Sequence, residues 1–257
     1  MNHKLLILCA VLAVPLLAET PARKITVSIE KKATAREQIE YARKLMRTVP
    51  ATRGEERHLA VANAAGNLTA VERAWPDDHA AIAEANVLLV ELYTNASMPQ
   101  NAIEAAERGL TKRPTDHRLY AAAGRAYERV GNKAAANASY EKLVETFDAR
   151  RGDWTENVGA LSAAAFFFEK DRQHTRAAVA LRRAAAVQGL TPTIRVTLLL
   201  RALEQSALTT DRGAVTADLA HLRDAHRRAL ATTLTPAQSE MLKIAEAAIE
   251  RYERGSR

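Results

Sequence analysis

The residues that most resemble a catalytic or metal-binding group lie together in the segment HLRDAH, toward the C-terminus. His221 and His226 are five positions apart, a spacing that places them off one another's face on a helix. A shared metal ion is therefore not expected. Asp218 and Asp224 lie on either side of His221, and we interpret these three residues as part of a solvated helix face.

Short motifs of catalysis are also missing from the sequence. It contains no HExxH, no GxSxG, no P-loop and no glycine-rich run that would cradle a phosphate. The paired carboxylates Glu55 and Glu56 fall at the start of a helical pattern, where they complement the helix dipole. We therefore predict a protein that is not an enzyme and binds no cofactor or metal. An enzyme with an unrecognised helical active site is the least favoured alternative.

Three arginines point to binding instead. Arg118, Arg125 and Arg129 recur at i, i+7 and i+11, which places their guanidinium groups on one face of a helix. Guanidinium forks match carboxylates well, so an acidic partner is one expectation. Glu84 precedes Arg118 by the same interval as Glu91 precedes Arg125 (118 − 84 = 125 − 91 = 34), so ion pairs between these equally spaced residues are the alternative.

The overall composition favours a folded, helix-rich chain. Of the 257 residues, 47% are hydrophobic and 26% are charged, values that are ordinary for a globular protein. Alanine is the commonest residue, and with 10 glycines and 8 prolines the chain has few obligatory breaks. The formal charge of +7 indicates either a solvated arginine-rich surface or an acidic partner. Nucleic acid is not expected as a partner, because the N-terminus indicates export.

The N-terminal segment, Met1 to Ala18, is typical of an export signal. A basic start up to Lys4 precedes an uncharged apolar run from Leu5 to Ala18, which is shorter than the roughly 20 residues that a membrane span needs. We expect cleavage after Ala18 or Ala22, a periplasmic or secreted protein, and no membrane span in the mature chain. An uncleaved signal that anchors the chain in the membrane, or an ordinary buried helix, is the alternative. Cys9 is the only cysteine, so the mature chain is expected to form no disulfide.

Beyond the signal, the pattern is helical almost throughout. Residues 24–32 alternate apolar and polar side chains, which predicts a short strand or an extended arm. Asp153 and Thr191 are expected to cap helices. Helical periodicity then predicts helices at 34–49, 55–75, 79–95, 99–112, 116–130, 133–149, 154–170, 174–188, 192–208, 212–232 and 236–254.

Aromatic and small residues recur along these helices at one spacing. Tyr127 follows Tyr93 at the same interval as Ala136 follows Ala102 (127 − 93 = 136 − 102 = 34). The next members, Phe168 and Ala177, both follow at a longer interval (168 − 127 = 177 − 136 = 41). One insertion of seven residues, around Arg151 to Asn157, explains both shifts.

These residues resemble the tetratricopeptide repeat family, whose unit is a helix hairpin of about 34 residues. The middle repeat, which begins at His117, carries the family's small and aromatic residues at Tyr120, Ala123, Gly124, Tyr127, Gly131, Ala136 and Tyr140. The resemblance implies an all-α fold, a right-handed α-solenoid of antiparallel helix hairpins with a C-terminal capping helix. A non-repetitive helical bundle is the alternative. The expected organisation is a signal peptide (1–18), an extended or flexible leader (19–33), degenerate hairpins (34–82), tetratricopeptide-like repeats (83–191) and a helical C-terminal region with its cap (192–257).

The resemblance also implies a function. In this family the first helix of each repeat lines a groove that binds a protein or peptide. Carried over to this chain, the expected contacts are Val87, Glu91, Arg118, Arg125, Arg129, Phe166 and Lys170. A Lys/Asn clamp for chaperone C-termini is not expected, because Val87 and Glu91 stand at its positions.

The leading expectation is therefore an exported interaction scaffold of a bacterial cell-envelope complex, with a protein or peptide partner that is acidic if the three arginines contact it. The alternative is a binding module for an anionic envelope polymer or lipid head group. Its arginine-rich surface would include Arg172, Arg176, Arg182, Arg183, Arg227 and Arg228.

Overall fold

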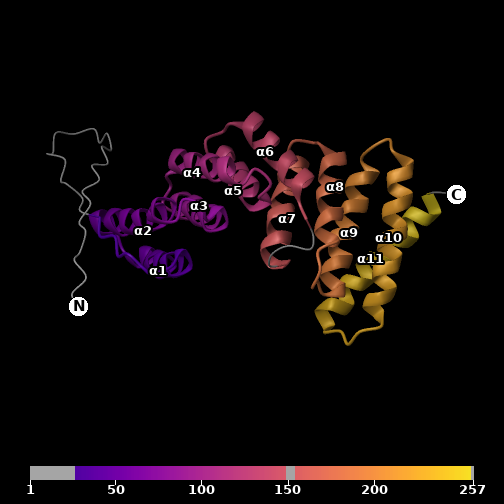
Figure 1. The fold of residues 1–257 in the computed structure, drawn as a ribbon. Helices are drawn as coiled ribbons and strands as arrows, with labels where there is room; N and C mark the ends of the chain where they lie inside the picture. The colour runs from indigo at the N-terminus through magenta and orange to yellow at the C-terminus, as the bar shows by residue number, and fades with distance from the viewer. Residues whose placement is uncertain (1–26, 149–153, 256–257) are drawn as a thin grey trace. The chain divides into compact units, whose positions relative to one another are not determined.

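The computed structural model describes residues 27–148 and 154–255, and nearly all of them lie in α-helices (Figure 1). None of the described residues is in a β-strand. Every predicted helix is present, with both ends within three residues of the expected positions. The helices are α1 (Ala35–Thr48), α2 (Gly54–Ala74), α3 (His79–Asn95), α4 (Pro99–Lys112), α5 (His117–Arg129), α6 (Lys133–Thr146), α7 (Trp154–Lys170), α8 (His174–Ala185), α9 (Pro192–Ala207), α10 (Arg212–Leu230) and α11 (Pro236–Gly255).

Two compact units divide the chain, Met1–Ala136 (unit 1) and Asn137–Arg257 (unit 2). In unit 1 each helix from α1 to α5 contacts the next, and α3 also contacts both α1 and α5. In unit 2 each helix from α7 to α11 contacts the next, and α11 also contacts α9. Contacts between helices two apart show that hairpins stack with equivalent helices side by side, as in helical repeats. The predicted all-α fold of stacked helix hairpins is confirmed.

The turn inside each hairpin repeats with the predicted spacing. Ser97, Gly131 and Arg172 follow α3, α5 and α7, and all three have positive φ, of 61°, 73° and 56°. Their intervals, 131 − 97 = 34 and 172 − 131 = 41, equal those of the aromatic and alanine series. In each turn the backbone N–H that follows this residue donates to a carbonyl five residues earlier, at 2.8, 3.0 and 2.8 Å. This left-handed helix ending therefore closes three equivalent hairpins.

Small residues lie where the two helices of a hairpin meet. Ala102, Ala136 and Ala177 are all fully buried, as their place in the repeat predicts. Gly109 lies at another close approach, because a Cβ there would come within 2.8 Å of Leu119 and 2.9 Å of Asn86. Side chains larger than these would force the helices apart.

An extended arm, residues 27–32, precedes α1 and packs on the first hairpin without forming a strand. Its backbone bonds to side-chain amides: Ser28 N–H donates to Asn63 (2.9 Å), Glu30 N–H donates to Asn67 (3.2 Å), and Asn67 donates to the carbonyl of Ser28 (2.9 Å). Val27 is buried and lies so close to Gly66 that a Cβ there would be 2.5 Å from it. These side-chain amides bond to backbone groups of the arm that a neighbouring β-strand would otherwise bind. The arm therefore packs on the first hairpin in an ordered, extended conformation.

The structure tests one of the two predicted helix caps and does not describe the expected signal peptide. The expected signal peptide and the expected helix cap at Asp153 lie outside the described residues. The cap at Thr191 is confirmed, because its hydroxyl accepts from the backbone N–H of Ile194 at 3.3 Å. No helix in the described ranges combines the length and apolar character needed to cross a membrane.

Candidate binding faces on the first helices

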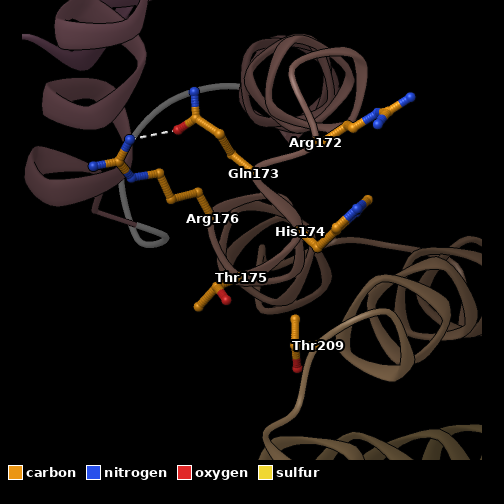
Figure 2. A pocket seen from close by; sticks show the side chains of 6 residues that line it. All are labelled: Arg172, Gln173, His174, Thr175, Arg176 and Thr209. Atoms are coloured by element: carbon orange, nitrogen blue, oxygen red, sulfur yellow. Dashed lines mark hydrogen bonds between the residues drawn. The ribbon is translucent and has the colours of Figure 1, made fainter.

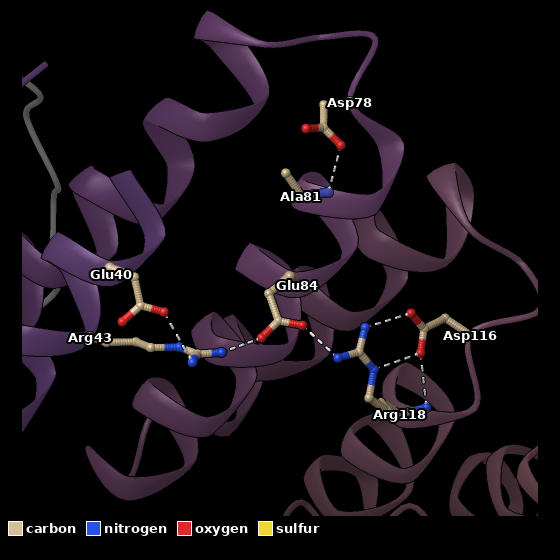
Figure 3. Close-up of polar contacts among 7 residues, drawn as sticks. All are labelled: Glu40, Arg43, Asp78, Ala81, Glu84, Asp116 and Arg118. Carbon is tan, nitrogen blue, oxygen red and sulfur yellow. Dashed lines mark hydrogen bonds and ion pairs between the residues drawn. The ribbon is translucent and has the colours of Figure 1, made fainter. Parts of the chain in front are cut away.

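A ladder of ion pairs runs across the first helices of three consecutive hairpins in unit 1 (Figure 3). The carboxylate of Glu84, on α3, pairs with Arg43 of α1 through one oxygen and with Arg118 of α5 through the other, at 2.5 Å. Asp116, the N-cap of α5, then accepts two bonds from the same guanidinium group, from Nε at 3.2 Å and from Nη2 at 3.0 Å. The ladder therefore ties α1, α3 and α5 together.

The contacts of the ladder shift the pKa values of two of its members, Asp116 and Arg118. Burial raises the pKa of Asp116, but the hydrogen bonds and positive charge of Arg118 outweigh it, so the pKa lies below its ordinary value. The bond to Asp116 outweighs burial at Arg118 and, with Glu84, raises the pKa of the guanidinium group. All charges in the ladder are thus balanced by partners within unit 1. The predicted alternative, an ion pair between repeats, is confirmed for Arg118.

The other two arginines of the predicted stripe behave differently. Arg125 and Arg129 are exposed, and in the described part of the chain neither forms an ion pair. Glu91 is also exposed, and the expected pair between Glu91 and Arg125 is not formed. Val87 lies half-buried one turn before Glu91 on α3. The face of α3 and α5 in unit 1 therefore presents two guanidinium groups without internal partners, one helical turn apart.

In unit 2 the corresponding face of α7 carries an exposed aromatic ring. Phe166 is 63% exposed, although its neighbours Phe167 and Phe168 are buried against Tyr140. One turn further on, Lys170 is exposed and has no ion pair among the described residues. Both residues of α7 that the resemblance assigns to the groove, Phe166 and Lys170, are thus exposed, as expected.

One acidic residue of this face is neutralised. Glu169 accepts from Arg201 of α9, at 2.9 and 3.0 Å. The face therefore offers an apolar ring and a lysine, with the neighbouring carboxylate already paired. Among the seven predicted contact residues, five lie in unit 1 and two, Phe166 and Lys170, in unit 2.

The alternative function, binding of an anionic polymer or lipid head group, requires an arginine-rich surface. Most of the six arginines expected on that surface are bonded to other residues of this chain. Arg176 pairs with Glu141 at 2.6 Å, Arg182 with Asp218 at 3.1 Å and Arg228 with Asp224 at 2.7 Å. The guanidinium group of Arg183 donates to the carbonyl of Phe147 at 3.4 Å. Only two of those six arginines, Arg172 and Arg227, lack such a contact with the described residues.

The acidic and histidine cluster near the C-terminus corrects one expectation. Asp218 is fully buried, pairs with Arg182 and accepts from the Ser206 hydroxyl at 2.6 Å. His226 is also buried, with its Nε2 3.1 Å from the carbonyl oxygen of Leu242. The predicted solvated face was therefore wrong for Asp218, which α8 and α9 cover, whereas His221 and Asp224 are exposed as expected. Among the described residues no group of three or more His, Cys, Asp or Glu could hold a metal ion.

No family model matches the chain, and no curated protein matches its sequence. The comparison with solved structures gives several similarities at low scores. The crystal structure of MamA protein gives a TM-score of 0.46 at 13% identity and covers 78% of this chain and 99% of that one. PilW, a widely conserved type IV pilus biogenesis factor, gives 0.45 at 15% identity, with 88% and 93% covered. A tetratricopeptide repeat protein from Parabacteroides merdae gives 0.23 at 12% identity, with 82% and 98% covered.

Because these scores are low, the assignment of the fold rests on the helix contacts, the buried small residues and the repeated left-handed turns described above. Together they define a tetratricopeptide-like helical repeat fold, and the predicted resemblance is confirmed at that level.

Proposed function

We propose that this chain is an exported, non-enzymatic scaffold that binds a partner protein or peptide on the faces of its first helices, within a bacterial cell-envelope complex. One observation carries the proposal. Arg118 is neutralised by Glu84 and Asp116, whereas Arg125 and Arg129 on the same helix are exposed and form no ion pair with any residue that the structure describes. Charges that do not stabilise the fold are available to a ligand.

The chemistry of the two faces suggests what the partner offers. Two guanidinium groups one turn apart favour carboxylates on the segment that binds unit 1. On unit 2, the exposed ring of Phe166 favours an apolar side chain, since a large aromatic residue buried by a partner contributes strongly to affinity. An acidic segment and an apolar anchor are therefore the expected features of partner sequences.

The test compares two double charge reversals in the mature chain. Arg125→Glu with Arg129→Glu should lower affinity for the partner captured from envelope extract by at least tenfold, since loss of a charged contact at an interface costs about 2–5 kcal/mol. Arg53→Glu with Arg73→Glu is the matched control. Both control arginines are exposed, lie in the same unit and form no ion pair among the described residues, and their reversal changes the net charge equally.

Equal losses from both double variants would show that net charge, not the face, governs binding. Phe166→Ala should weaken binding with an unchanged melting temperature, because a ring that is 63% exposed contributes little to the core. A variant that melts at the same temperature and binds equally well would remove Phe166 from the interface.

The alternative, an anionic polymer or lipid head group, is disfavoured because internal contacts hold four of its six arginines. Binding that falls steeply with salt and is lost equally in both double variants would favour it. Export is tested separately. The N-terminal sequence of protein recovered outside the cytoplasm should begin at Glu19 or Arg23, and an intact Met1 on a cytoplasmic species would contradict it.

A further inference from the structure

A small hollow lies in unit 2 where the turn after α7 meets the end of α9 (Figure 2). Its volume is about 340 Å³, and its lining consists of Arg172, Gln173, His174, Thr175, Arg176 and Thr209. Most of these side chains carry hydrogen-bond donors, and none is acidic. The hollow is therefore suited to a group rich in acceptors, and its lining includes neither Phe166 nor Lys170 of the α7 face.

Two basic side chains of the hollow are available to such a group. Arg172 is exposed and has no ion pair with any described residue. His174 uses one ring nitrogen, Nδ1, in a hydrogen bond with Gln205 at 2.9 Å, which orients the ring and leaves Nε2 unengaged by the described residues. Figure 2 shows the two side chains projecting toward the same side of the turn. Both side chains also line the same hollow.

The third basic side chain is occupied. Arg176 projects away from the other two, toward Gln173, and pairs with Glu141 at 2.6 Å. The amide of Gln173 in turn donates to Asp171, at 3.0 Å. Arg176 therefore balances the charge of Glu141, whereas Asp171 accepts a hydrogen bond from an amide that carries no charge.

The residue type at position 172 is unusual for its backbone conformation. Arg172 has φ 56° at a turn position where the equivalent residue after α5 is Gly131, with φ 73°. Glycine adopts this conformation without the steric penalty that a side chain incurs. An arginine at this position therefore makes the turn less stable than a glycine would. No ion pair between its side chain and a described residue offsets that effect.

We propose that this hollow binds an oxyanion, a phosphate or carboxylate group, through Arg172 and His174. The guanidinium group supplies two parallel donors, and the imidazole supplies a third donor from Nε2 when it is protonated. The Thr209 side chain borders the opposite side of the hollow. The site is independent of the partner-binding faces, so either proposal can fail alone.

The test titrates the purified mature chain with inorganic phosphate, with acetate, and with sodium chloride at matched ionic strength, by calorimetry or by backbone amide shifts. We expect saturable binding of phosphate or of acetate that chloride does not reproduce, and the two arms identify the preferred oxyanion. Arg172→Gly should weaken this binding by at least tenfold, which corresponds to about 1.4 kcal/mol. His174→Gln should weaken it by a smaller factor.

Arg172→Gly has a second readout that protects the test from misfolding. Because glycine suits the turn, the variant should melt at the same temperature as the parent chain or at a higher one. Ser97→Gly is the matched control, since Ser97 has φ 61° in the equivalent turn after α3 and does not line the hollow. It should leave oxyanion binding unchanged. The proposal is overturned if the parent chain binds neither oxyanion saturably, or if Arg172→Gly binds as tightly as the parent.

Discussion

Glu84 is the residue with which to test whether the ion-pair ladder of unit 1 stabilises the fold. Its carboxylate pairs with Arg43 on one side and with Arg118 on the other. Glu84→Ala removes both pairs at once and leaves the two guanidinium groups without the negative charge between them. The consequence for stability can be worked from the exposure of the three side chains.

The side chains of Glu84, Arg43 and Arg118 are 25%, 38% and 29% exposed. Solvent therefore screens both pairs, and each contributes at most about 1 kcal/mol. Arg118 keeps its two bonds to Asp116 in the variant, which limits the loss. We expect Glu84→Ala to lower the free energy of unfolding of unit 1 by about 1–2 kcal/mol. Glu91→Ala removes an exposed side chain without an ion pair and should change it by less than about 0.5 kcal/mol.

The assay needs a signal from unit 1 alone. The chain has two tryptophans, of which Trp75 packs against the core of unit 1 and Trp154 lies in unit 2. In a Trp154→Phe background, fluorescence during urea unfolding reports unit 1. Double-mutant cycles should give coupling between Glu84 and each arginine of the ladder, and none between Glu91 and Arg125. The assignment of Arg118 to structure fails if Glu84→Ala costs no more than Glu91→Ala.

Four further changes test other contacts. Gly109→Ala should lower the free energy of unfolding by about 1–2 kcal/mol in a urea titration, because overpacking outweighs the gain in helix propensity. Asn67→Ala should lower the free energy of unfolding by about 1–3 kcal/mol and make the arm susceptible to protease, because the backbone of the arm loses its hydrogen bonds to the Asn67 side chain. Burial, followed by the bond to Glu107, raises the pKa of Tyr127 to about 12. Because the unfolded phenol ionises near pH 10, stability should fall between about pH 10 and 12, and less in Tyr127→Phe. The lowered pKa of Asp116 stabilises the fold above about pH 4 and is lost in acid, so Asp116→Asn should flatten the acid limb of the pH–stability curve.

The helices were predictable because their ends are marked by local chemistry. Proline begins α4, α9 and α11, and Thr191 caps α9 through a hydroxyl that the sequence identifies. The hairpin turn after α5 has a glycine at the position that needs positive φ. The equivalent turns have Ser97 and Arg172, which carry no sign of that conformation in their residue type. There the interval between equivalent positions of the repeat is the only guide in the sequence.

Side-chain partners were less predictable than helices. Asp218 lies on a helix among residues that read as a solvated face, but its partner Arg182 lies much earlier in the sequence, on α8. Asn67 likewise pairs with the arm at residues 28 and 30 through contacts that depend on where α2 packs. A helical pattern shows which face a residue occupies, whereas its bonds depend on the three-dimensional arrangement of neighbouring helices.

The ion-pair partners of a charged residue, which only the structure shows, also decide whether that residue is a candidate for binding a partner protein. The sequence places Arg118, Arg125 and Arg129 on one helix face and gives no reason to separate them. The structure separates them, because Glu84 and Asp116 balance the first and leave the other two exposed. A charged side chain that stabilises the fold does so through internal ion pairs that compensate for its desolvation. A partner must displace these ion pairs before it can bind the side chain. If the partner presents a carboxylate, as we propose, Arg125 and Arg129 can bind it without first giving up an ion pair to a described residue, and these two arginines are therefore the first positions to change.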